Sequence, residues 1–120
     1  MNKLLLVGRL TADPELKENK KDSCSCRFSV AVRRSFKNSE GEYEADFINC
    51  VAFNGQAELI HDFCSKGQLV SVEGRIQTGT YEDSEGITRK SFDCIVEKLT
   101  FLESKKEETK EDKKSKYSRK

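Results

Sequence analysis

The sequence is short of several features, and each shortage narrows the class of protein. It has no tryptophan, one proline and one histidine among 120 residues. Its longest apolar runs are only four residues, Leu4–Val7 and Cys50–Phe53, whereas a membrane span needs about 18. The start of the sequence, Met1-Asn2-Lys3, lacks the apolar stretch of a secretory signal. We therefore expect a cytoplasmic protein with no membrane partner, of a length that suits one domain.

The charges are balanced in total but distributed unevenly. There are 22 basic and 21 acidic residues, for a net charge of +1. Residues 104–120 hold eight basic and four acidic side chains, whereas residues 1–103 hold 14 basic and 17 acidic ones. Because residues 104–120 also lack apolar periodicity, we expect them to form a disordered basic tail after a single domain, residues 1–103. Binding of an anion would then depend on where the charges lie, not on their sum.

The five cysteines can be interpreted in two ways. They are Cys24, Cys26, Cys50, Cys64 and Cys94. An odd number without a secretory signal indicates free thiols in a reducing compartment. Cys24, Cys26, His61 and Cys64 could supply four zinc ligands, but neither pair has the usual zinc-knuckle spacing. Four of the five lie within apolar patterns, so we favour buried hydrophobic roles and expect no metal or other cofactor.

The hydrophobic pattern predicts five strands and one helix. The strands are expected at residues 3–10, 27–34, 46–54, 69–78 and 91–102, with a charged loop at 17–23. Between the third and fourth strands the period changes. There the apolar positions suit one side of a short helix that ends near Gly67; they are Ala57, Leu59, Ile60, Phe63 and Cys64. Turn residues at 38–41 and 83–86 predict two long hairpins. This order predicts an all-β OB-fold, a five-stranded Greek-key barrel with one helix between strands three and four.

No catalytic motif is present. The sequence contains no phosphate-binding loop ending in Gly-Lys-Ser/Thr, no His-Glu-x-x-His and no nucleophile elbow. A single histidine leaves little material for histidine-based acid–base chemistry. We therefore do not expect an enzyme.

Four aromatic residues are candidate binding residues. Phe36 and Tyr81 each lead into a charged hairpin turn, where burial is hard to achieve. Phe47 and Phe53 share one face of the third predicted strand, and there a core-facing stripe is an equal alternative. If the rings are exposed, they can stack on nucleic-acid bases of any sequence, at about 1–3 kcal/mol for each base.

Basic residues on or beside the predicted strands are candidates for contact with phosphates. They are Lys3, Arg33, Arg34, Lys37, Lys66, Arg75, Arg89 and Lys90. The strongest local signal is Arg33-Arg34-Ser35-Phe36-Lys37, where three cations surround one aromatic ring. The alternative is ordinary solvation or surface ion pairing. The basic tail would add salt-sensitive attraction to polyanions.

Residues 1–103 closely resemble the bacterial-type single-stranded DNA-binding protein family. The matching segments are Met1–Leu16, Phe28–Lys37, Ala45–Phe53, Gln56–Glu58, Lys66–Gly67, Val72–Thr78 and Tyr81. The resemblance implies an OB-fold subunit of a homotetramer that binds single-stranded DNA without reading sequence. It also implies protection of exposed strands in replication, recombination and repair. By the same resemblance, the stacking residues are Phe36, Phe47, Phe53 and Tyr81, and the backbone contacts include Lys3, Lys37 and Lys66.

The sequence departs from the family pattern at three places. Gly79-Thr80 and Asn54-Gly55 stand where basic residues are common, which predicts weaker binding by the same mode. Family members that dock replication and repair enzymes usually end in an acidic tip with Pro-Phe. This sequence ends in the basic segment Lys116–Lys120, so docking through such a tip is not expected. Two other hypotheses are an RNA-binding OB domain and a protein-interaction module that has lost nucleic-acid binding.

Overall fold

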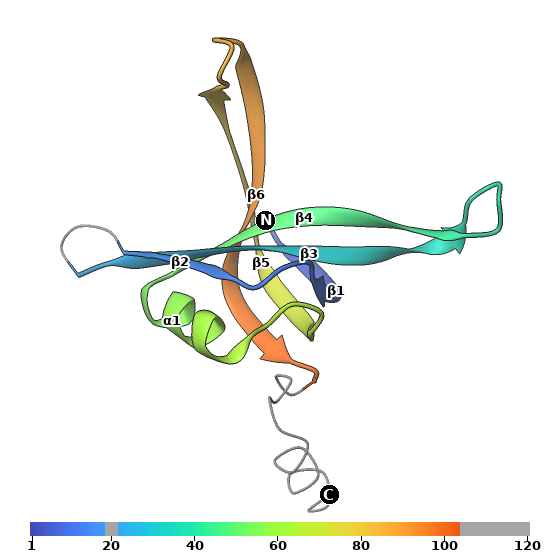
Figure 1. The fold of residues 1–120 in the computed structure, drawn as a ribbon, viewed down its shortest axis with the longest axis horizontal. Helices are drawn as coiled ribbons and strands as arrows, with labels where there is room; N and C mark the ends of the chain where they lie inside the picture. Colours follow the sequence, from blue (N-terminus) through green and yellow to red (C-terminus); the bar gives the residue numbers. More distant parts are fainter. Residues whose placement is uncertain (19–21, 104–120) are drawn as a thin grey trace, which may run out of the picture.

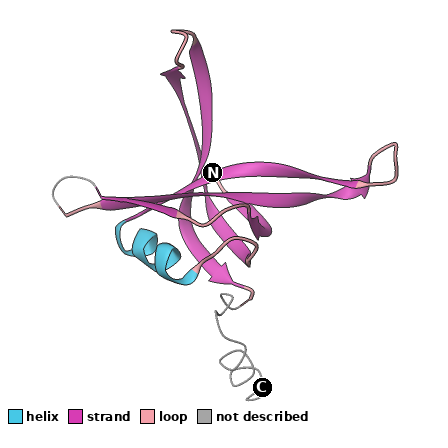
Figure 2. Cartoon of the chain, viewed as in Figure 1, coloured by secondary structure: helices cyan, strands magenta, loops and turns pink. Residues whose placement is uncertain are grey.

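The computed structural model describes residues 1–18 and 22–103, which form six strands and one helix (Figures 1 and 2). In chain order these are β1 (Leu4–Leu10), β2 (Glu15–Glu18), β3 (Cys24–Lys37), β4 (Tyr43–Phe53), α1 (Asn54–Phe63), β5 (Leu69–Glu82) and β6 (Thr88–Phe101). The predicted basic tail, residues 104–120, lies outside the described residues, so the domain boundary stays a prediction.

Five of the strands close into a barrel. Neighbouring strands follow the order β1-β5-β6-β4-β3-β2, and β1 also pairs with β3 through Arg9↔Ala31 and Leu10↔Val30. β4 and β6 run parallel where Cys50 pairs with Cys94, whereas the other paired strands run antiparallel. The helix comes between the third and fourth strands of the barrel. This arrangement confirms the predicted OB-fold.

Every second side chain along the barrel strands points inward, and these side chains fill the interior of the barrel. Leu6 and Leu10 of β1, Val30 of β3 and Val70 of β5 are all buried. All five cysteines are buried and free. Burial raises the pKa of the Cys26 thiol to about 11 and raises that of Cys50 further, so both stay protonated at neutral pH. The cysteines therefore act as the predicted small hydrophobes. No metal-binding cluster of His, Cys, Asp or Glu occurs in the part of the chain that the structure describes.

The helix α1 covers one end of the barrel, where it packs against β2, β3 and β4 (Figure 1). Ala57 and Ile60 are buried, but Leu59 and Phe63 are exposed, so the predicted apolar side was too wide. The helix also ends earlier than predicted. It stops at Phe63, and Gly67 instead forms a turn with φ +88°, where its N–H donates to the carbonyl of Leu10. Among the described residues, no helix is long and apolar enough to cross a membrane.

Both predicted hairpins extend beyond the barrel as long arms, one formed by β3 and β4 and the other by β5 and β6 (Figure 1). Their turns are built alike. Asn38 Oδ1 accepts the N–H groups of Glu40 and Glu42, and Asp83 Oδ1 accepts those of Glu85 and Ile87. The strands of these arms extend further than predicted. In their outer parts both faces are exposed, so the sequence there shows no alternation of apolar residues from which a strand could be predicted.

The prediction of a loop at residues 17–23 was partly wrong. Glu15–Glu18 forms the short strand β2, which pairs along the edge of β3 from Arg27 to Cys24. Three of its four residues are exposed, and only Leu16 packs against the core. A strand with so little burial leaves no apolar period to detect.

Candidate nucleic-acid interface

The four predicted aromatic residues all have exposed rings. Their exposed fractions are 70% for Phe36, 68% for Phe47, 48% for Phe53 and 54% for Tyr81. These values overturn the alternative that Phe47 and Phe53 form a core-facing stripe. Tertiary structure, not spacing, sets this outcome, because β4 presents Phe47 and Asn49 outward while Cys50 and Ala52 fill the barrel.

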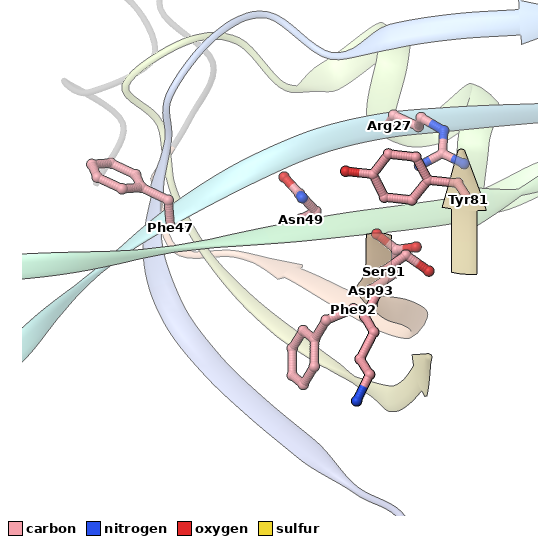
Figure 3. Close-up of a pocket in the computed structure, with 8 residues that line it drawn as sticks. Arg27, Phe47, Asn49, Tyr81, Ser91, Phe92 and Asp93 are labelled. Atoms are coloured by element: carbon pink, nitrogen blue, oxygen red, sulfur yellow. The ribbon is translucent and has the colours of Figure 1, made fainter. Parts of the chain in front are cut away.

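Two of these rings border one cleft with a volume of about 670 Å³ (Figure 3). Its lining residues are Arg27, Phe47, Asn49, Tyr81, Lys90, Ser91, Phe92 and Asp93. Figure 3 shows Phe47 toward one side, Tyr81 toward the other and Asn49 between them in that view. The cleft therefore joins two flat apolar surfaces with polar groups from β3, β4 and β6. Phe36 and Phe53 do not line it.

A second hollow, of about 350 Å³, adjoins this cleft. It shares Arg27 and Asn49 with the first and continues toward Thr11 and Asp13, on the segment that links β1 to β2, and Glu15 at the start of β2. Together the two hollows form a groove across β3 and β4. The sequence analysis did not select Arg27 or Asn49. Asn49 shares the face of the strand that carries Phe47 and Phe53, which was a usable signal, whereas Arg27 lies far from the predicted aromatics in the sequence.

Three of the predicted phosphate-binding cations already have carboxylate partners. Lys3 Nζ lies 3.2 Å from Glu73 and 2.9 Å from Glu97. Arg34 binds Glu44 at 2.9 Å and Asp46 at 2.8 Å, while Arg89 binds Asp83 at 2.9 Å. The hydrogen bonds that Lys3 donates to Glu97 and, second, to Glu73 raise the pKa of Lys3. For these three residues the surface-ion-pair alternative describes the observed contacts, and a phosphate would have to displace a carboxylate.

Among the residues that the structure describes, the other predicted cations have no such carboxylate partner. Arg33 and Lys37 lie over the Tyr43 ring, 4.4 Å and 5.7 Å from its centroid, and these cation–π contacts leave their charges uncompensated. Lys90 borders the aromatic cleft. Arg75 donates to Gln77, and Lys66 lies in the turn after α1, where its backbone N–H donates to Asp13 of the second hollow. The structure thus brings only Lys90 of the predicted cations into the cleft.

The carboxylates of the two arms should titrate differently when their arginines are removed. The Arg34 side chain lowers the pKa of Asp46 below its ordinary value of 3.8. The pKa of Asp83 is lowered first by the backbone N–H of Ile87 and second by Arg89. In carboxyl-detected NMR titrations, we expect Arg34→Gln to return the pKa of Asp46 close to 3.8, whereas Arg89→Gln leaves that of Asp83 depressed.

The same shift sets the pH range over which the Asp46 pair acts. Because folding lowers the pKa, the contribution of this pair to stability is complete above pH 3.8 and is lost as the pH falls through the lowered value. An Asp46 titration that is identical in the native protein and in Arg34→Gln would contradict the pairing.

A closed OB barrel with exposed rings and polar groups along one groove is typical of proteins that hold single-stranded nucleic acid. The Single-strand binding protein family matches residues 1–102, and the chain belongs to that family. It is 46% identical over 105 residues to Single-stranded DNA-binding protein 3 of Listeria innocua, and these residues make up 88% of this chain and 66% of that protein. It is 45% identical over 105 residues to Single-stranded DNA-binding protein 1 of Staphylococcus aureus, with 88% and 67% covered.

A third relative is longer. The single-stranded DNA-binding protein of Lactiplantibacillus plantarum is 44% identical over 107 residues, which cover 89% of this chain and 54% of that protein. The matched part of the chain thus spans between about half and two thirds of the length of these three relatives. The family match confirms the resemblance inferred from the sequence.

Proposed function

We propose that this protein binds single-stranded DNA without reading an extended sequence, and that it breaks no bond in doing so. The observation that carries the proposal is the exposure of Phe36, Phe47, Phe53 and Tyr81 on an OB barrel of the Single-strand binding protein family. Acting in the cytoplasm, it would cover strands opened during replication, recombination and repair. The printed names of its relatives, single-stranded DNA-binding proteins, support the choice of ligand.

Stacking supplies the attraction and excludes duplex DNA. A flat ring needs the face of a base, and paired bases hide their faces within the helix. Phe47 and Phe53 are six residues apart on β4, hence roughly 20 Å apart along an extended strand. Bases spaced along a flexible single strand can reach both rings. Lys90 beside the cleft, with Arg33 and Lys37 on the β3–β4 arm, would attract the phosphates between those bases.

Assembly into a homotetramer is part of this proposal. Leu5 and Val7 alternate on the outward side of β1 and are 71% and 54% exposed, beside the buried Leu6. Two aliphatic side chains in neighbouring outward positions favour burial against another copy of the chain. Wrapping of one DNA strand around several copies would then use the stacking rings of each.

Titration with oligo-dT tests the proposed function. Because tryptophan is absent, tyrosine fluorescence reports binding, and we expect quenching at low salt that weakens as salt rises. A Tyr81→Phe variant should keep its affinity with much less quenching. Duplex DNA of equal length should bind far more weakly, and native mass spectrometry of the same samples reports the number of copies for each strand.

Two outcomes would contradict the proposal. Absence of binding to oligo-dT at low salt would favour the protein-interaction module. A clear preference for RNA in competition between matched DNA and RNA oligonucleotides would favour the RNA-binding OB domain.

A further inference from the structure

A third aromatic residue, Phe92, lines the cleft that Phe47 and Tyr81 border. The sequence analysis did not select it. Phe92 is 48% exposed, as is Phe53, and among the described residues its ring forms no pair with another aromatic ring. In the view of Figure 3 the Phe92 ring lies below Asp93, whereas the Tyr81 ring lies above it. The cleft therefore presents a third exposed ring to a bound strand.

The cleft lies between β4 and β6, at the point where the two strands separate into different arms. They pair at Cys50↔Cys94 and Val51↔Ile95 and at no earlier residue of the described chain. Figure 1 shows the two arms leaving the barrel in different directions. The edge of β6 that precedes Cys94 is therefore open toward β4 among the described residues. Side chains from both faces of β6 can reach the cleft across this open edge.

The register of the β5–β6 arm shows which rings share a face. Residues directly opposite each other in an antiparallel pair point to the same face. Phe92 is opposite Thr78, and Tyr81 is opposite Arg89, three positions further along the arm. Because faces alternate along a strand, Phe92 and Tyr81 lie on opposite faces of the arm. Both line one cleft, so the cleft bends around the edge of β6.

The surroundings of Phe92 suit a nucleotide. Lys90 lies on the same face two residues away, about 7 Å along the strand, and it lines the same cleft. The residues opposite Lys90 and Phe92 on β5 are Thr80 and Thr78, whose short side chains leave the ring exposed. An uncovered ring beside a cation offers one nucleotide both a stacking surface and a charge for its phosphate.

A second copy of the chain is the alternative occupant of this ring. The centre of an interface between protein chains is depleted in charged residues. Phe92, however, shares its cleft with the charged residues Arg27, Lys90 and Asp93. The outward aliphatic residues of β1, which the proposed assembly uses, do not line this cleft. A single strand with its phosphates fits these surroundings better than another copy does.

We propose that Phe92 is a fifth stacking residue, and that the bound strand crosses the edge of β6 so that its bases contact both faces of the β5–β6 arm. Tyr81 holds a base on one face, and Phe92 holds a base on the other, with Lys90 beside it for the phosphate. Duplex DNA is too stiff to follow so sharp a path. This inference rests on the proposed function and deepens it, because it requires a single strand held in the cleft.

Photochemical cross-linking tests the contact directly and needs no variant. The probe is oligo-dT in which single thymines are replaced by 5-iodouracil, which on irradiation couples to a stacked aromatic ring with loss of hydrogen iodide. Trypsin then releases residues 91–98, in which Phe92 is the only aromatic residue. We expect fragment spectra to place an adduct on Phe92 as well as on Tyr81. Adducts on Phe47 and Tyr81 without one on Phe92 would overturn the inference.

Substitutions measure how much this ring contributes to affinity. Phe92→Ala should weaken the binding of oligo-dT about fivefold or more, which is the lower limit for one stacked base. Phe92→Tyr retains a ring and should bind within about twofold of the native protein. Ile87→Ala is the matched control, because Ile87 is 47% exposed in the turn of the same arm but does not line the cleft. It should leave the affinity unchanged.

Native mass spectrometry with oligo-dT separates the outcomes. Phe92→Ala should keep the native number of copies for each bound strand. Loss of copies in this variant would assign Phe92 to contact between copies and overturn the inference, as would native affinity in the folded variant. Either result leaves single-stranded DNA binding standing, whereas absence of binding by the native protein overturns the proposed function itself.

Discussion

Replacement of the four exposed rings by alanine is expected to weaken the binding of single-stranded DNA by about a thousandfold or more. The variant combines Phe36→Ala, Phe47→Ala, Phe53→Ala and Tyr81→Ala. Each stacked base contributes about 1–3 kcal/mol, so even the lower limit sums to about 4 kcal/mol over four rings, and each 1.4 kcal/mol corresponds to a tenfold change in affinity. Anisotropy titrations with a labelled oligo-dT measure the loss.

A single-ring comparison controls for the general effect of removing an exposed phenylalanine. Phe63 is 53% exposed, but it lies at the end of α1 and packs edge-on against Phe101, with 6.5 Å between ring centroids. Phe63→Ala should leave DNA affinity unchanged, whereas Phe47→Ala should lower it by at least fivefold. Circular dichroism confirms that each variant is folded. A quadruple variant that retains affinity within tenfold of the native protein would refute the stacking mechanism.

Gly8→Ala is expected to destabilise the barrel by about 3 kcal/mol, the upper part of the range for overpacked positions. Gly8 lies on the inward side of β1, near the point where β1 pairs with β3 to close the barrel. A Cβ atom there would come within 2.3 Å of the Ala31 carbonyl oxygen and 2.7 Å of Val30 Cγ1. Because one of these neighbours is backbone, the strands themselves must separate. Urea denaturation measures the change in the free energy of unfolding.

Gly55→Ala supplies the matched control. Gly55 lies in α1, and a Cβ atom there would meet no other atom within 4 Å. Alanine is a better helix former than glycine by up to about 1 kcal/mol, so this variant should be as stable as the native protein or more stable. Equal stability of Gly8→Ala and Gly55→Ala would show that the barrel closes with more room than the structure indicates.

The fold was largely predictable because each barrel strand has one buried face and one exposed face, which makes apolar and polar residues alternate in the sequence. Alternation in β1, β3 and β4 and turn residues near Asn38 and Asp83 located most of the elements. The sequence did not reveal β2 or the outer parts of the hairpin arms, where both faces meet solvent and no period exists. Leu59 and Phe63 have helical spacing with the core residue Ile60, yet they lie outside the contact with the barrel.

The binding surface was predictable in its residue types but not in its arrangement. Apolar residues occupy both faces of β4, so exposure of Phe47 and Phe53 could not be decided without the barrel around them. The pairing of Lys3 with Glu73 and Glu97 joins distant parts of the chain that only the closed sheet brings together. Asn49 and Asp93 give no signal alone, because only the parallel register of β4 and β6 brings them into one cleft.

The carboxylates beside Lys3, Arg34 and Arg89 have a consequence for how the protein responds to its ionic surroundings. They act as tethered counterions, which remain at the surface however dilute the solution becomes. The salt dependence of DNA binding arises from mobile ions that phosphates and cations release into bulk solvent. A strand that displaces a tethered carboxylate releases no such ion from that cation. The affinity of this interface therefore varies less steeply with salt than the number of its basic residues implies.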